Sequence, residues 1–201
     1  MKKILFAALV PVFVLVAFKV NIDPLPIGAS LPKPDVKMED VSGNMVSLSE
    51  AKKENGLLVM FSCNTCPVVI KNQSRTIEAS KHALANNVGV VLLNSNEGTR
   101  NGGDSFDEMK KYAKNQGYEW NYVVDKNHEL ADAFGANRTP EVFLFDKNGT
   151  LVYHGAIDDN PQDESAVTRN YLKEAVNELA EGKEITVKES KSIGCTIKRK
   201  K

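Results

Sequence analysis

Two cysteines separated by two residues, Cys63 and Cys66, lie where an apolar segment meets a segment of helical character. The apolar residues 57–61 predict a buried strand, and the helical pattern runs from about residue 67 to residue 84. The pair is therefore expected at a strand-to-helix turn. The first turn of a helix has free N–H groups and a partial positive charge, which favour a thiolate over a thiol. We therefore expect Cys63 to be exposed and its pKa to be lowered.

The same spacing predicts a chemistry. A thiolate is the species that attacks a disulfide, and a second thiol one helical turn away can displace the captured partner. The sequence thus predicts a dithiol–disulfide exchange site with Cys63 as the nucleophile and Cys66 as the resolving thiol. Because Asn64 and Thr65 between them are uncharged, we expect a middling to reducing potential.

Other uses of the cysteine pair remain as alternatives. A C-x-x-C pair supplies two of the four ligands of a typical structural zinc site. This chain has no second cysteine pair, and its three histidines lack the spacing of zinc ligands. A structural disulfide within the pair would close so short a loop that it would stabilise little. A non-catalytic thiol module, such as a metallochaperone or an assembly factor, is a further alternative. We expect no metal and no other cofactor.

Residues 1–20 have the pattern of a targeting segment rather than of a part of the folded domain. Lys2 and Lys3 precede a continuous apolar run at residues 4–18, which is short for a membrane span and suits a signal-peptide core. We expect export to the periplasm or another extracytoplasmic space, where disulfides persist. Cleavage, or retention as a membrane anchor through residues 4–18, stays open. The alternative is a buried N-terminal helix or strand of the domain.

The rest of the chain suits a single domain. Residues 21–34 contain four prolines and predict an extended linker, and residues 35–201 are long enough to bury a good core. The 201-residue sequence has a formal net charge of zero, which gives no sign of nucleic-acid binding. Its third cysteine, Cys195, lies in a segment that reads as extended. It is either a third redox thiol that reaches back to the dithiol or a packed or unpaired residue, and we favour the latter.

Hydrophobic periodicity predicts an α/β domain. Two short strands at residues 36–38 and 45–46 predict an N-terminal hairpin, and Ser47 with Glu50 predicts a capped helix after them. Strands and helices then alternate up to a final hairpin and helix. The expected strands are 57–61, 88–94, 122–124, 142–145 and 151–154, and the expected helices are 67–84, 106–116, a segment from 125 to 134, and 166–180. Such an order predicts a central mixed sheet with helices on both faces.

The order of strand, C-x-x-C, helix and then Thr139-Pro140 before a strand and a hairpin resembles the thioredoxin superfamily, from about Pro34 to Ala180. The resemblance implies a thioredoxin-like fold in which the peptide bond before Pro140 is cis and lies against the dithiol. An extended substrate chain would then pair with the exposed backbone of Thr139. Arg138, next to this pair, either supports the thiolate electrostatically or is a surface residue.

Finer marks are similar to those of exported redoxin-like proteins of the peroxiredoxin and TlpA type. They are residues 61–67, 94–96, 104–106, 138–146, 153–160 and 194–198. This resemblance implies a monomeric thiol–disulfide oxidoreductase that acts on disulfides in protein partners and receives electrons from an upstream donor.

The sequence also departs from these families. Ser62 replaces the tryptophan that usually precedes the first cysteine, and Leu57 and Val69 stand where relatives often carry an acid. Proton transfer from Cys66 would then use water, a more distant side chain or the substrate. A thiol-dependent peroxidase is the alternative enzyme, but such relatives carry a threonine three residues before the attacking cysteine. Here that position is Met60.

Overall fold

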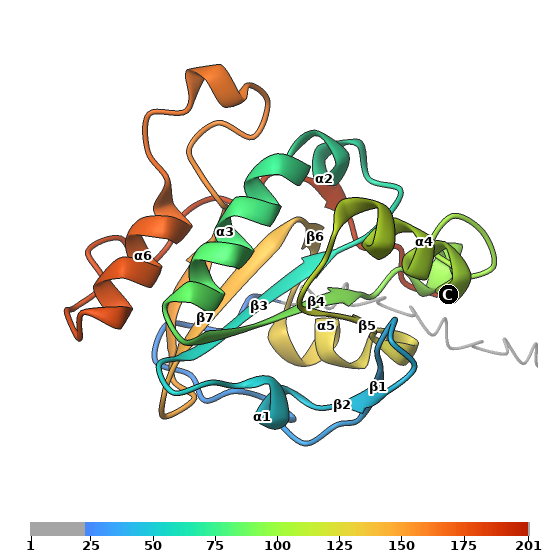
Figure 1. The fold of residues 1–201 in the computed structure, drawn as a ribbon, viewed down its shortest axis with the longest axis horizontal. Coiled ribbons are helices and arrows are strands. Elements are labelled where there is room, and N and C mark those ends of the chain that lie inside the picture. The colour runs from blue at the N-terminus through green and yellow to red at the C-terminus, as the bar shows by residue number, and fades with distance from the viewer. Residues whose placement is uncertain (1–22, 201) are drawn as a thin grey trace, which may run out of the picture.

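The computed structural model describes residues 23–200. The expected signal peptide or anchor at residues 1–20 lies outside the described residues. A five-stranded mixed sheet forms the centre, in the order β5-β4-β3-β7-β8. Helices cover both of its faces, as expected for the α/β domain (Figure 1).

The dithiol-bearing strand β3 (Gly56–Ser62) lies in the middle of this sheet. On one side it pairs in parallel with β4 (Val88–Asn94), which pairs in parallel with β5 (Asn121–Val124). On the other side it pairs antiparallel with β7 (Glu141–Asp146), and β8 (Leu151–Gly155) completes the final hairpin. Every residue of β3 and β4 is buried, which explains their continuous apolar runs.

Alternate residues of β3 enter two separate cores, because successive side chains of a strand point to opposite faces. Leu58 and Met60 pack with α3 (Gln73–Ala85), α4 (Phe106–Gln116) and α6 (Tyr171–Ala180). Leu57, Val59 and Phe61 pack with α1 (Leu48–Ala51) and α5 (Glu129–Phe134). The helices on the two faces of the sheet therefore hold the C-terminal end of β3, where Cys63 follows, from both sides.

Most local predictions are confirmed. The N-terminal hairpin forms from β1 (Met38–Glu39) and β2 (Met45–Val46), and Ser47 and Glu50 form the capping box of α1. Ser105 caps α4, and Gly117 ends it in the left-handed conformation that glycine favours. The carboxylate of Asp125 accepts the first N–H groups of α5, from Leu130 and Ala131.

Three helix predictions are wrong in their extent. The helix expected from residue 125 to residue 134 begins only at Glu129, after a 3-10 turn, η2 (Lys126–His128), in which Asn127 and His128 have positive φ angles. The expected helix at residues 67–84 is divided at Asn72 into α2 (Pro67–Lys71) and α3. The Asn72 side chain donates to the carbonyl oxygens of Val68 and Pro161, and the second of these lies 89 residues away. The last helix begins at Tyr171 rather than at residue 166, since a separate 3-10 turn, η3 (Glu164–Ala166), precedes it.

The chain ends in an extended segment that runs back across the molecule. Its strand β9 (Cys195–Thr196) pairs antiparallel with β6 (Arg138–Thr139), which immediately precedes Pro140. Within residues 23–200, no helix is both long enough and apolar enough to span a membrane.

Candidate dithiol site

The two cysteines lie at the strand-to-helix turn that the sequence predicts. Cys63 follows the last residue of β3, and Cys66 is the N-cap of α2, with Pro67 in the first turn. Proline is well tolerated there because its missing N–H would have no helical partner. The helix thus begins after Cys66, so Cys66 and not Cys63 is the sulfur next to the helix terminus.

The residue before the cis proline contacts both sulfurs. The Thr139–Pro140 peptide bond is cis, as the resemblance implies. The Thr139 hydroxyl oxygen lies 3.4 Å from Cys63 Sγ within hydrogen-bond reach, and its carbonyl oxygen lies 3.3 Å from Cys66 Sγ. Thr139 is 1% exposed, so both contacts are made away from bulk water. The fold therefore brings Cys63, Cys66, Thr139 and Pro140 together.

The expectation of an exposed Cys63 thiolate is wrong for this state of the protein. Cys63 is only 1% exposed, and burial raises the pKa of its thiol. The Thr139 hydroxyl and the N–H groups of Thr65 and Cys66 favour the thiolate, but they do not outweigh burial and the nearby Asp104 carboxylate. The helix-terminus argument fails because Cys63 lies outside the helix and is covered.

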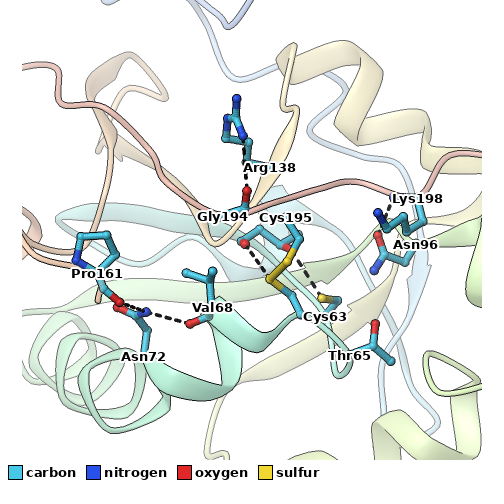
Figure 2. Close-up of a disulfide and its surroundings, with 12 residues drawn as sticks. Cys63, Thr65, Val68, Asn72, Asn96, Arg138, Pro161, Gly194, Cys195 and Lys198 are labelled. Carbon is cyan, nitrogen blue, oxygen red and sulfur yellow. Dashed lines mark hydrogen bonds between the residues drawn. A yellow bond between two sulfur atoms is a disulfide. The ribbon is translucent and has the colours of Figure 1, made fainter. Parts of the chain in front are cut away.

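Cys195 completes the site and corrects a second expectation. It forms a disulfide with Cys66, across a Cα–Cα distance of 5.9 Å and a sequence separation of 129 residues. The favoured interpretation of Cys195 as a packed or unpaired residue is therefore wrong: the segment reaches back and joins Cys195 to the cysteine pair. Figure 2 shows this disulfide with the free Cys63 beside it.

Backbone and side-chain hydrogen bonds hold the segment around Cys195, residues 194–199, which we call the C-terminal tail. The Ile197 N–H donates to the Asn137 carbonyl (3.0 Å), and the Lys198 N–H donates to the Asn96 side chain (2.8 Å). The Gly98 N–H in turn donates to the Lys198 carbonyl (2.6 Å). The Ile197 side chain is buried in the core that the sheet forms with α1 and α5. The tail is therefore packed into the fold.

The tail occupies the edge that we expected a substrate to use. In the register of β6 and β9, Thr139 is paired with Cys195 and Arg138 with Thr196. The exposed Arg138 donates to the carbonyl oxygen of Gly194, as Figure 2 shows. Arg138 thus contacts the tail, and the Thr139 backbone is not open in this state.

The structure adds a site residue to which the sequence analysis gave no role, Asp104. Its carboxylate is fully buried and accepts hydrogen bonds from the Asn64 N–H and the Thr65 hydroxyl, both between the two cysteines. Three further donors come from outside the dithiol loop: Asn94, Asn96 and Thr99. Burial would raise the pKa of Asp104, but these hydrogen bonds outweigh it and lower the pKa. The only sequence signal was its place in residues 104–106, one of the segments that carried the resemblance.

A second buried acid orders the other side of the site. Glu141, which follows Pro140, accepts the N–H groups of Asn137 and Arg138 and pairs with His154 Nε2 at 2.8 Å. These contacts fix the turn that carries Thr139. Residues 23–200 contain no group of three or more His, Cys, Asp or Glu side chains placed to hold a metal ion.

Comparison with known proteins agrees with this geometry. The Redoxin family model matches residues 27–172. The thiol-disulfide oxidoreductase ResA of Bacillus subtilis is 24% identical over 119 residues, which are 59% of this chain and 62% of that protein. The match thus spans less than two thirds of the relative's length.

Two solved structures resemble almost the whole chain. An uncharacterized conserved protein from Geobacillus kaustophilus is 34% identical with a TM-score of 0.81, covering 87% of this chain and 93% of that one. A hypothetical protein from Sinorhizobium meliloti 1021 is 31% identical with a TM-score of 0.81, covering 89% and 97%.

The mixed sheet, the cysteine pair at the strand-to-helix turn and the cis proline against it define a protein of the thioredoxin superfamily. Within that superfamily, the chain belongs to the Redoxin family. The relationship to a thiol-disulfide oxidoreductase supports the expectation of an oxidoreductase.

Proposed function

We propose that the protein is an exported thiol–disulfide oxidoreductase that uses Cys63 and Cys66 to reduce or exchange disulfides in protein partners. The observation that carries this proposal is the convergence of three cysteines on Thr139, with one pair already joined as a disulfide. A site that holds a free thiol against a disulfide is built for exchange between sulfurs.

The reaction with a partner has two steps. The Cys63 thiolate attacks one sulfur of the partner's disulfide, forms a mixed disulfide with it and releases the other sulfur as a thiolate, which takes up a proton. Cys66 then loses its proton and attacks Cys63 Sγ, which releases the partner's second thiol and leaves a Cys63–Cys66 disulfide. A dithiol donor restores the enzyme by the reverse exchange and becomes a disulfide itself.

Trapping with a defined substrate tests these roles. Insulin is incubated with the reduced Cys66→Ser/Cys195→Ser protein, which keeps the nucleophile but has no thiol to resolve the intermediate. We expect a covalent insulin adduct that a dithiol reductant dissolves, and no adduct with the control Cys63→Ser/Cys195→Ser. Equal adducts from both proteins, or insulin reduction by the single variant Cys63→Ser at the wild-type rate, would refute the assignment.

We also propose that residues 1–20 direct export and that residues 21–34 join them to the domain, against whose core Leu25, Ile27 and Leu31 pack. The lysine pair and the apolar run at residues 4–18 support this. Fusion of the full chain to a phosphatase that is active only outside the cytoplasm should give activity, and removal of residues 2–20 should abolish it. The mass of the protein recovered from cells distinguishes cleavage from retention.

A further inference from the structure

The C-terminal tail lies where an extended substrate would lie. Thr139, the residue before the cis proline, pairs through its backbone with Cys195 in an antiparallel register. Strand addition of this kind is a common way to bind an extended peptide, with backbone hydrogen bonds supplying affinity. The tail thus makes the backbone contact of a bound partner. Its covalent bond differs, because Cys195 is joined to the resolving Cys66, whereas a partner would be joined to Cys63.

The close approach of the tail depends on a glycine. A Cβ atom at Gly194 would lie 2.1 Å from the carbonyl oxygen of Thr139 and 3.2 Å from the nitrogen of Pro140. Any side chain at this position would push the tail away from the turn that carries Thr139. The docking surface is therefore a specific fit to the sequence Gly194-Cys195, with Ile197 anchored in the core two residues further on.

The bound tail also covers the sulfur atoms of Cys63 and Cys66. Cys63 and Cys66 are 1% and 3% exposed, and Cys195 packs against them together with Val68 and Val69. While the tail is bound, the Thr139 edge is paired and neither cysteine of the C-x-x-C is open to a protein. A partner can react only after the tail has left.

We propose that the C-terminal tail is a built-in substrate mimic that closes the dithiol site, and that Cys63 opens the site by displacing Cys195 from Cys66. This inference rests on the proposed function and extends it with a regulatory role for Cys195. The tail and the protein partners compete for the backbone edge of Thr139. The partners that the site accepts therefore share the features of the tail: an extended segment with a small residue directly before the reacting cysteine.

The opening step needs no outside oxidant or reductant. Cys63 loses its proton, and its thiolate attacks Cys66 Sγ; the Cys63–Cys66 bond forms as the Cys66–Cys195 bond breaks. Cys195 leaves with the electron pair of the broken bond and takes up a proton. The oxidation state of the Cys63 sulfur rises by one as that of the Cys195 sulfur falls by one, so the protein as a whole is neither oxidised nor reduced. Each isomer contains one disulfide and one thiol. The open isomer can then be reduced by the dithiol donor and enter the reaction with a partner.

Alkylation followed by mass mapping tests the gate in the full-length protein. Protein with one disulfide is acid-quenched, unfolded in denaturant and alkylated without reductant. The ratio of labelled Cys195 to labelled Cys63 then gives the ratio of the open to the closed isomer. We expect Gly194→Ala to raise this ratio on the order of tenfold, because it removes a close fit and several hydrogen bonds without touching a sulfur. The matched control Gly102→Ala, whose added Cβ meets only ordinary contacts, should leave the ratio unchanged.

A second variant covers the case in which Gly194→Ala does not fold. Oxidised Cys195→Ser should contain only the Cys63–Cys66 disulfide. With a dithiol donor supplied as the source of electrons, it should catalyse insulin reduction without the initial lag expected of the oxidised wild-type protein. Absence of a Cys66–Cys195 disulfide from the wild-type protein, an unchanged ratio in folded Gly194→Ala, or equal lags would overturn the gate. Loss of insulin reduction in every protein, with the shift in ratio intact, would instead overturn the proposed function alone.

Discussion

At the scale of single residues, the environment of Cys63 decides how the site responds to pH. Its thiol is surrounded by groups that differ in effect: the Thr139 hydroxyl and two backbone N–H groups favour the thiolate, and the Asp104 carboxylate opposes it. Three nearby phenols, those of Tyr112, Tyr118 and Tyr122, have raised pKa values and stay neutral at physiological pH. Burial is the largest effect, and it raises the pKa of Cys63.

The first prediction concerns this thiol. Because burial raises its pKa, Cys63 in the closed protein is a thiol at neutral pH. Its alkylation rate should therefore rise only when the pH exceeds the ordinary pKa of a cysteine thiol. Asp104→Asn removes a negative charge and should therefore lower the pKa of Cys63. The measurement is the pH profile of iodoacetamide labelling, with Asp107→Asn on the first turn of α4 as the charge-matched control. An unchanged or raised pKa in Asp104→Asn would contradict the argument.

At the scale of elements, Asn72 separates α2, which carries the dithiol turn, from α3. Its side-chain amide bridges the Val68 carbonyl and the Pro161 carbonyl at 2.7 and 2.9 Å. Asn72 is 2% exposed, so no water replaces these bonds easily. The break therefore ties the short dithiol helix to the loop at residues 158–161.

The second prediction follows from this bridge. Asn72→Ala should lower the free energy of unfolding by about 1–3 kcal/mol, since it removes both hydrogen bonds of a buried side chain and leaves the Pro161 carbonyl only its longer bond from Arg75 (3.4 Å). Urea denaturation measures the loss, and Asn148→Ala on the exposed β7–β8 turn serves as a control. Stability equal to that of the wild-type protein would show that the break does not depend on the bridge.

The elements also show what the sequence could and could not predict. Strands such as β3 and β4, the cap at Ser47 and the cis bond before Pro140 were predictable, because each depends on local pattern or on a motif. The break at Asn72 has no glycine or proline to mark it, and its cause is a carbonyl 89 residues away. The Cys66–Cys195 bond joins residues 129 positions apart, and sequence spacing does not reveal such a pairing.

At the scale of the whole molecule, a buried ion pair joins α3 to the loop before η3. Arg75 and Asp158 lie 2.6 Å apart, and their side chains are 5% and 1% exposed. Arg75 also donates to the Asn160 carbonyl. The pair thus holds the same loop that Asn72 contacts, from the side of the core.

The third prediction is that breaking this pair is more costly than replacing it. Arg75→Met should destabilise the fold by about 3–5 kcal/mol, because it leaves a buried carboxylate without its partner. The double variant Arg75→Met/Asp158→Leu should recover a large part of the loss. Thermal and urea unfolding of both variants measure this. A double variant less stable than Arg75→Met would contradict the explanation.

The fourth prediction concerns the loop that the Cys66–Cys195 disulfide closes. Because a bond across 129 residues restricts the unfolded chain more than the short Cys63–Cys66 ring does, the closed protein should be more stable than oxidised Cys195→Ser by about 3 kcal/mol on the chain-entropy model. Denaturation without reductant measures the difference. In the presence of reductant the two proteins should unfold at similar denaturant concentrations, and a persistent gap would point to packing instead.

The size of that covalent ring has a practical consequence. A denatured chain tied between residues 66 and 195 is more compact than the same chain tied only between residues 63 and 66. The two isomers should therefore migrate as separate bands in a non-reducing denaturing gel, with the large ring running faster. After acid quenching, the fraction of molecules in each form could be read from whole cells by immunoblot.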